Sequence, residues 1–452
     1  MLPTTPVPKK WNQIIRHLGP GLIISAVIVG SGELIVAPKL GAAVGFSLLW
    51  FILFGCFIKV FVQVELGRYA VSKGVTTLEA MNSIPGPRLI VSWLVWLWVL
   101  MYVALIFQVA GMVGGIASVF SLAGISFTGT FLAAFESKQV LAVMVGLACI
   151  GLLVVGRYRL VEVLCTALVA VFTVCTLFAV GALQSTDYAI TGAQILEGFK
   201  FQLPSNFTTA FAAFGIIGVG ASELIYYPYW CLEKGYARNV GPDDGTAGWV
   251  ERARGWIRVM NIDAWVSFVI YTTATVAFFL LGAAVLHAKN LQVENSEMIA
   301  TLSHMYRETF GEGSFRLFLL GAFAVLFSTV FGATASNARL LADALTLFGV
   351  VKYKAPEDRV RMVRMSCVLL PCAFVSVYLM WGEPVSLVFV GALAQGLMLP
   401  FLAGAAIYFR YRRTDQRLAP GRAWTVLLWF AGLSMSAVGI YKVGEELLKL
   451  FK

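Results

Sequence analysis

Long apolar stretches alternate with short polar connections along the whole chain, which is the pattern of a protein that crosses a membrane many times. A helix needs about 20 predominantly apolar residues to span a bilayer, and the sequence contains eleven such stretches. The sequence therefore predicts an all-α integral membrane protein with eleven transmembrane helices. The stretches lie near 19–43, 46–71, 90–120, 139–156, 160–183, 208–234, 258–288, 314–347, 361–381, 385–409 and 423–449.

The composition supports this class. Of 452 residues, 59% are hydrophobic and 13% are charged, whereas a soluble domain carries about 25% charged residues. The net charge of +10 would suggest a nucleic-acid partner for a soluble protein. Here the basic residues precede the first stretch and follow the second, fourth, sixth, eighth and tenth. By the positive-inside rule we expect a multi-pass protein of the plasma membrane, with a cytoplasmic N-terminus and an extracellular C-terminus. Its surroundings are the lipid bilayer, and nucleic acid is excluded as a partner.

Two of the apolar stretches are interrupted near their middle by similar polar segments. The first contains Gly30-Ser31-Gly32-Glu33, and the sixth contains Gly220-Ala221-Ser222-Glu223. Glycine and serine loosen a helix at these points, and a carboxylate in hydrocarbon is costly unless it has a function. Matched interruptions in corresponding segments indicate the binding site of an inverted-repeat transporter.

The position of the two interruptions divides the chain into repeats. They lie five spans apart, in the first and the sixth, so the halves are predicted to have opposite orientations in the membrane. We expect a cytoplasmic arm over residues 1–18, a first repeat over 19–183 and a second repeat over 208–411. Residues 423–449 then form an additional eleventh helix.

The interrupted segments supply the predicted binding site for a small inorganic ion. A helix that restarts around Ser31 would point its N-terminal N–H groups and the positive end of its dipole into a cavity. Glu33 would then either cap that helix or act as an ion ligand or proton carrier, and both alternatives stay open. The full predicted set for substrate binding is Gly30, Ser31, Gly32, Glu33, Ala221, Ser222, Glu223 and Tyr226.

Several motifs outside these segments resemble one known family. They are Gly19-Pro20-Gly21 in the first stretch, Gln63, Arg68 and Gly74 around the second, and Ile262-Asp263 in the seventh. Arg361 to Pro371 and Leu399-Pro400-Phe401 extend the likeness to the ninth and tenth stretches. With these motifs the chain resembles the Nramp (natural resistance-associated macrophage protein) family of divalent-metal transporters. The resemblance implies the LeuT-type fold, a 5+5 inverted repeat with unwound first and sixth helices, plus one extra helix.

The chain departs from that family where the metal signature belongs. The family's Asp-Pro-Gly-Asn falls on Gly30-Ser31-Gly32-Glu33, and its Met-Pro-His falls on Ser222-Glu223-Leu224. The family's glutamine in the tenth helix falls near Ala392, one turn from Gln395, and Gln108 stands where the third helix would carry acids for a proton relay. Because Mn²⁺ and Fe²⁺ sites use carboxylate, imidazole or thioether ligands, transition-metal transport is not expected.

Two substrates remain for such a site. Small residues, hydroxyl groups and helix N-termini suit a small anion, and bicarbonate is the first choice. Glu33 and Glu223 instead suit a hydrated hard cation, so a divalent cation, Mg²⁺ before Mn²⁺, is the alternative. A sensor that does not transport is a further alternative, whereas an enzyme is not expected because the spans contain no nucleophile paired with a base.

Ion coupling rests on other residues. Ser328 and Thr329 lie in the eighth stretch, where folds of this type often hold Na⁺ beside carbonyl groups of the first helix. Asp263, near the start of the seventh stretch, is either a buried titratable group or the N-cap of its own helix. We therefore expect Na⁺ or H⁺ as a coupling ion, with no resident metal and no other cofactor.

Overall fold

The computed structural model describes residues 5–125, 137–154, 158–202, 207–295, 297–310 and 314–450. Within these ranges, eleven helical segments are long and apolar enough to cross a membrane. The predicted all-α class with eleven spans is thus confirmed. The uninterrupted spans are α4 (Leu49–Lys73), α6 (Trp93–Leu122), α7 (Ser137–Val154), α8 (Tyr158–Leu183), α15 (Ser314–Leu347), α16 (Pro356–Trp381), α17 (Pro384–Arg412) and α18 (Arg422–Leu450).

The other three spans consist of more than one segment. The first is α2 (Pro20–Ile28), η1 (Val29–Val36) and α3 (Ala37–Val44), the sixth is α10 (Phe207–Ile216) and α11 (Ala221–Lys234), and the seventh is α13 (Ala247–Leu281) with η3 (Gly282–His287). Short elements connect the spans: α1 (Trp11–His17), α5 (Thr77–Asn82), α9 (Gly192–Glu197), α12 (Tyr236–Val240), α14 (Met298–Phe310), η4 (Gln416–Leu418), and a small hairpin of β1 (Arg88–Leu89) and β2 (Val91–Ser92).

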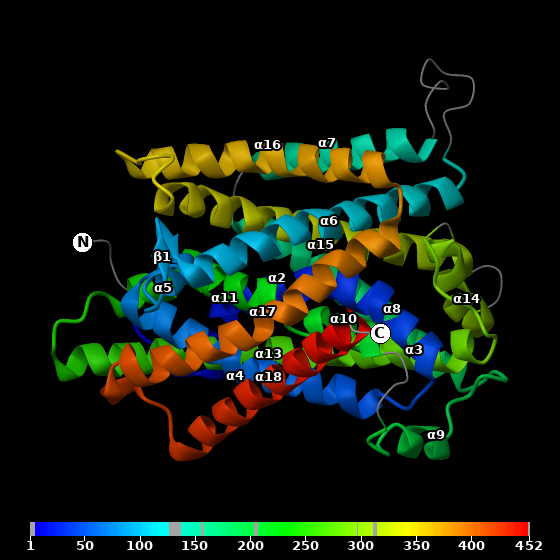
Figure 1. The fold of residues 1–452 in the computed structure, drawn as a ribbon, viewed down its shortest axis with the longest axis horizontal. Coiled ribbons are helices and arrows are strands. Elements are labelled where there is room, and N and C mark those ends of the chain that lie inside the picture. Colours follow the sequence, from blue (N-terminus) through cyan, green and yellow to red (C-terminus); the bar gives the residue numbers. More distant parts are fainter. Residues whose placement is uncertain are drawn as a thin grey trace.

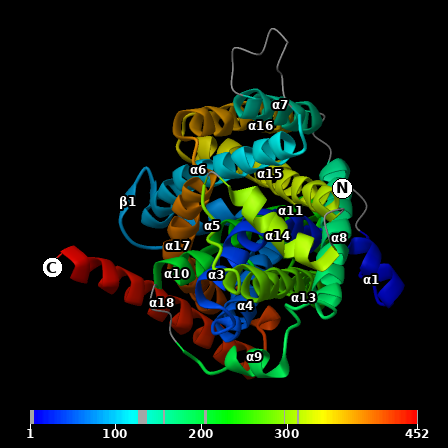
Figure 2. The ribbon, with the colours of Figure 1, turned by 90° about the vertical axis from the view of Figure 1, so that its right-hand side faces the viewer.

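The interrupted spans form the centre of the bundle. In the most apolar window of each span, 94% of the first and 89% of the sixth is buried, against 24% of the fifth and 28% of the eleventh. α7 and α16 lie side by side at one edge, and α18 crosses the opposite side with its C-terminal end at the periphery (Figures 1 and 2). Since no lipid reaches the central spans, their polar residues contact protein.

The first span is widened rather than opened at its middle. Val29–Val36 is a π-helix, in which each N–H bonds to the carbonyl five residues earlier, as the Ala37 N–H does to Gly32. The predicted restart of the helix around Ser31 is therefore wrong, because the backbone stays hydrogen-bonded through Glu33. The wider turn places no free helix N-terminus in the centre of the protein.

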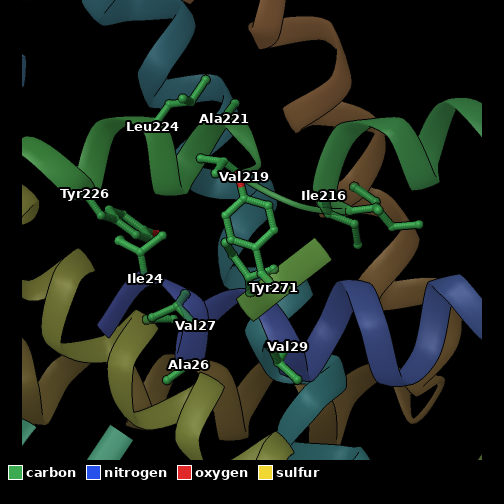
Figure 3. Packing of buried hydrophobic residues seen from close by; sticks show 14 of the residues in the cluster. Ile24, Ala26, Val27, Val29, Ile216, Val219, Ala221, Leu224, Tyr226 and Tyr271 are labelled. Atoms are coloured by element: carbon green, nitrogen blue, oxygen red, sulfur yellow. The ribbon is translucent and has the colours of Figure 1, made fainter. Parts of the chain in front are cut away.

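The sixth span is truly broken, as predicted. α10 ends at Ile216 and α11 begins at Ala221, and we call the connecting residues 217–220 the break. Gly218 lies in the break with φ +65°, a conformation that glycine adopts without a steric penalty. Figure 3 shows the extended connection between Ile216 and Ala221, with Tyr271 between this connection and the first span.

The seventh span begins earlier than the apolar pattern predicts. α13 starts at Ala247 with Thr246 as its N-cap, so the charged segment before 258 continues the same helix instead of forming a separate interfacial one. Its far end packs closely on the first span: an ideal Cβ on Gly282 would lie 2.5 Å from the Pro38 carbonyl oxygen, and one on Gly41 would lie 2.6 Å from the Phe279 carbonyl oxygen. These two glycines let α3 and η3 come into backbone contact.

Candidate functional site

The break in the sixth span is held by charged side chains from two other spans. Lys59 on α4 donates from Nζ to the carbonyl oxygen of Ile217 at 2.7 Å, and the N–H of Gly218 donates to Glu33 Oε1 at 3.2 Å. The carbonyl of Ile217 and the N–H of Gly218 belong to one peptide group. A cation therefore contacts the negative end of this peptide dipole, and an anion contacts its positive end.

Glu33 is fully buried and faces the break, not its own helix. Its Oε1 also accepts the hydroxyl of Thr275 on α13 at 2.6 Å, whereas its Oε2 has no hydrogen-bond partner. The side chain is 0% exposed. Of the two predicted roles, capping of the first helix does not describe these contacts. The carboxylate instead links the first, sixth and seventh spans and keeps one oxygen available.

Lys59 was not predicted as a site residue. Its side chain is also 0% exposed, and its ammonium group donates to the carbonyl oxygens of Phe214 and Ile217 at the C-terminal end of α10. The nitrogen lies 4.9 Å from the centroid of the Phe214 ring. The last carbonyls of a helix have no partner within the helix, and Lys59 binds them.

On the other side of the break, the start of α11 is tied to the tenth and third spans. The N–H and the hydroxyl of Ser222 both donate to Gln395 Oε1, at 2.9 Å each, and Gln395 Nε2 donates to Gln108 Oε1 at 2.9 Å. The structure thus brings Ser222 together with the tenth-span Gln395, which was not among the predicted site residues. These hydrogen bonds leave neither the amide N–H nor the hydroxyl proton of Ser222 free to donate to a ligand.

Glu223 lies in the first turn of α11, as predicted, and is 6% exposed. Its Oε2 has no hydrogen-bond partner. An ideal Cβ on Gly220 would lie 2.5 Å from this oxygen and 2.5 Å from Gln395 Oε1. The absence of a side chain at Gly220 therefore makes room for the Glu223 carboxylate beside the break.

Two tyrosines border the same region. Tyr226 on α11 donates to Asn337 Oδ1 of the eighth span at 2.8 Å. Tyr271 of α13 points at the break with its hydroxyl beside Val219 (Figure 3), and this buried oxygen has no hydrogen-bond partner. Tyr226 was predicted in the site, whereas Tyr271 was not.

The small residues of the predicted set fill tight contacts. Any Cβ on Gly30 would clash with Thr329, and one on Gly32 would lie 2.9 Å from the Ile216 carbonyl oxygen. Ala221 is buried as the first residue of α11. The side chain of Ser31, the remaining member of the set, lies outside the described residues. Glycine is thus required where the first span touches the eighth and sixth spans.

The predicted coupling residues separate into two places. The Thr329 hydroxyl donates to the Ala26 carbonyl of the first span at 3.0 Å. The Ser328 hydroxyl lies 3.3 Å from the same oxygen but makes its shorter hydrogen bond, 2.8 Å, to the Val325 carbonyl of its own helix. Both hydroxyls thus lie beside the first span, where the sequence placed them. Asp263 lies inside α13, where its carboxylate accepts the N–H groups of Gly19 at 2.9 Å and Gly21 at 2.6 Å. Asp263 therefore caps the first span and not its own helix.

The free atoms at the break decide its chemistry. Glu33 Oε2, Glu223 Oε2 and the Tyr271 hydroxyl are buried oxygens without hydrogen bonds, whereas the N–H groups of Gly218 and Ser222 are bonded to protein oxygens. Across the part of the chain that the structure describes, no three His, Cys, Asp or Glu side chains gather at one point. The site offers oxygen ligands in small number, which suits a cation that keeps part of its water shell.

Comparison with known proteins assigns the chain to a family. The model of the "Natural resistance-associated macrophage protein-like" family matches residues 21–445. The chain is 25% identical over 444 residues to the divalent metal cation transporter MntH of Deinococcus radiodurans, covering 97% of this chain and 92% of that protein. It is 23% identical to the metal transporter Nramp6.2 of Populus trichocarpa, covering 95% of this chain and 74% of that one.

Solved structures share the fold. A mutant of the manganese transporter of Eremococcus coleocola superposes with a TM-score of 0.72 at 15% identity, covering 99% of this chain and 91% of that one. Mhp1, a nucleobase-cation-symport-1 family transporter, superposes with a TM-score of 0.60 at 13% identity, covering 94% and 89%. These likenesses confirm the predicted LeuT-type fold.

Proposed function

The chain belongs to the Natural resistance-associated macrophage protein-like family, and from this premise we propose that it carries a divalent cation, Mg²⁺ before Mn²⁺, through the break between its first and sixth spans. As a multi-pass membrane protein of this family it is a secondary transporter and not an enzyme. What remains to be proposed is its cargo, its coupling and its orientation.

The observation that carries the proposal is the pair of buried carboxylates with unused oxygens. Glu33 and Glu223 flank the break, and each keeps an Oε2 without a hydrogen bond. The Lys59 ammonium binds carbonyl groups of α10 instead of either carboxylate, so both carboxylates stay available. A buried carboxylate oxygen without a partner is costly, and a cation would relieve that cost.

The choice of Mg²⁺ before Mn²⁺ follows from the ligand set. Only oxygen atoms are available, and they are few. Mg²⁺ is commonly bound by one or two carboxylates while it keeps several waters. An all-oxygen site also accepts Mn²⁺, which is therefore the second choice, whereas Fe²⁺ gains from nitrogen ligands that the residues at this break do not supply. The names of the metal-transporting relatives support a divalent cargo in general.

Bicarbonate, the first choice from the sequence, stays a prediction. It depended on free amide groups in the two interrupted segments. The π-helix keeps the first segment hydrogen-bonded, and the amides of Gly218 and Ser222 are taken by Glu33 and Gln395. An anion would have to displace these oxygens, so the contacts favour a cation.

We also propose Na⁺ as the coupling ion, bound where Ser328 and Thr329 meet the Ala26 carbonyl. Asp263, whose oxygens already accept two amides and the Tyr227 hydroxyl, is a poorer candidate. The orientation with a cytoplasmic N-terminus and an extracellular C-terminus remains a proposal from the basic connections. Labelling of single cysteines introduced into those connections tests it in intact cells.

The state described is closed around the site, since Glu33, Lys59 and Gln395 are each 0% exposed. Transport then requires the bundle to open to each side in turn, with rigid groups of helices rocking about the two interrupted spans.

Uptake into proteoliposomes tests the cargo. Three assays are made on one preparation. A Mg²⁺-sensitive dye in the lumen measures Mg²⁺ uptake, quenching of lumenal calcein measures Mn²⁺ uptake, and a pH-sensitive dye in the lumen measures the response to bicarbonate. We expect Mg²⁺ uptake, weaker Mn²⁺ uptake, and losses of about 10- to 100-fold in Glu33→Gln and in Glu223→Gln, since each removes one charged ligand. Glu251→Gln on the exposed start of α13 is the control for charge removal. Bicarbonate-dependent pH change without uptake of either cation would overturn the proposal.

A further inference from the structure

Lys59 is a buried cation with no ion pair. Among the described residues, no carboxylate lies within salt-bridge distance of its ammonium group. The partners it does have are the Phe214 and Ile217 carbonyls and the Phe214 ring. Buried charges are costly without compensation. The Glu223 and Glu33 carboxylates act on Lys59 electrostatically from beyond salt-bridge distance, so the groups in direct contact with its ammonium are of another kind.

The end of α10 supplies that environment. The C-terminal end of a helix carries about half a negative charge on its unpaired carbonyls, and here it terminates at the break inside the protein. In broken transporter helices such ends coordinate the transported or coupling cation. A lysine ammonium is a compact point charge that can bind the same carbonyls.

We propose that the Lys59 ammonium occupies a binding position for a monovalent cation, formed by the Phe214 and Ile217 carbonyls at the end of α10. Because this cation is part of the chain, we call it a resident cation. The protein then needs no free ion at this position to keep the broken helix in place. Its positive charge is fixed to α4, and it remains there while the cargo enters and leaves.

The opposite contact supports this role. Glu33 binds the N–H of the peptide group whose carbonyl Lys59 binds. The peptide between Ile217 and Gly218 is thus oriented from both ends, and Glu33 is one of the carboxylates assigned to the cargo. Lys59 is in this sense a positioning residue: it acts on the cargo site through the backbone of the break, without contacting the cargo.

Chemical rescue separates a resident cation from a side chain that only fills space. Lys59→Ala removes the ammonium and leaves room for a small cation, whereas Lys59→Met fills the same volume without charge. We expect the thermal midpoint of Lys59→Ala to fall and to rise again with ammonium or methylammonium chloride, compared with choline chloride at equal ionic strength. Lys59→Met should show no such response.

A matched control is available in the first span. Lys39 also donates to a backbone carbonyl, that of Val293 at 2.9 Å, and lies 5.1 Å from the centroid of the Phe389 ring. Neither of these partners belongs to the break, and the side chain of Lys39 is partly exposed. Lys39→Ala should therefore gain no more stability from ammonium than the unsubstituted protein does. Equal responses of Lys59→Ala to ammonium and choline would overturn the proposal.

Lys59→Gln serves if Lys59→Ala does not fold, because glutamine retains an N–H donor of similar reach without the charge. We expect this variant to fold and its uptake to fall roughly 10-fold, as loss of a hydrogen bond from a charged group predicts. Uptake at the rate of the unsubstituted protein would show that no cation is needed there. The inference rests on the proposed function only for this uptake measurement. The ammonium response is independent of the cargo, so the two proposals can fail separately.

Discussion

Lys59 and Glu33, on different spans, bind the two ends of a single peptide group in the break of the sixth span. The Lys59 ammonium lies 2.7 Å from the Ile217 carbonyl oxygen, and the Gly218 N–H lies 3.2 Å from Glu33 Oε1. Backbone that leaves a helix at membrane depth has to be satisfied by protein. Here the two charged side chains form the hydrogen bonds to this backbone, and Glu33 retains an unused carboxylate oxygen for a ligand.

Gly220 controls the space beside the Glu223 carboxylate. Because its φ of −75° suits any residue, Gly220→Ala should fold, but the new methyl group would displace Glu223 or Gln395. We expect Mg²⁺ uptake by this variant to fall by about 10-fold or more. Gly404→Ala, at a position with no neighbour within 4 Å, is the control. Equal uptake by the two variants would contradict the assigned position of Glu223.

Asp263 fixes the start of the first span. Asp263→Asn replaces one acceptor oxygen with a donor that faces the N–H of Gly19 or Gly21. Leaving a buried amide unpaired costs about 1–3 kcal/mol of stability, which thermal unfolding in detergent should reveal as a lower midpoint. The exposed Asp187→Asn should leave the midpoint unchanged. If Asp263→Asn instead keeps its midpoint and loses Na⁺ dependence, Asp263 belongs to the coupling site.

The contact between α3 and η3 requires glycine. Gly282→Ala would press a methyl group against the backbone of Pro38, and such overpacking costs about 1–3 kcal/mol. The expected result is a lower unfolding midpoint with an unchanged ratio of Mg²⁺ to Mn²⁺ uptake. Gly151→Ala, in open space on α7, provides the comparison. A changed ratio of Mg²⁺ to Mn²⁺ uptake would show that this contact contributes to the cation selectivity of the site.

Ser328 and Thr329 carry the proposed Na⁺ coupling. In the double variant Ser328→Ala with Thr329→Val, both hydroxyls beside the Ala26 carbonyl are absent, so stimulation of uptake by a Na⁺ gradient should disappear. The control is Ser303→Ala, whose hydroxyl bonds to Ala300 of its own helix at 2.6 Å. Persistent Na⁺ stimulation in the double variant would exclude this pair of hydroxyls.

Much of this architecture follows from the sequence because apolar length and glycine-rich interruptions are local signals. The spans and the burial of Glu33 and Glu223 are of this kind. So is the interruption of the sixth span, although the sequence placed it at 220–223 and the structure has it at 217–220. The π-helix could not be distinguished from an unwound segment, since both use the same glycine and serine residues. Its hydrogen bonds depend on neighbours that the linear pattern does not identify.

Lys59, and the hydrogen-bond partners of Asp263, escaped prediction for another reason. Lys59 bonds to residues 155 and 158 positions away, and Asp263 bonds to residues 244 and 242 positions away. A single lysine in an apolar stretch commonly reaches the interface with its long side chain, so nothing local indicates a partner. The early start of α13 differs from these cases: its signal is local, the Thr246 N-cap, but a pattern of apolar residues does not include it.

The widened turn at Val29–Val36 makes the chain sensitive to the number of residues it contains. A helix advances about 100° per residue, so removing one residue before Glu33 would let an ordinary α-helix form and would rotate that carboxylate away from Gly218. The composition of the segment would hardly change, yet the Glu33 carboxylate would face a different helix. In this segment, the number of residues determines where the Glu33 carboxylate lies, and so it matters to the site as much as the identity of the side chain does.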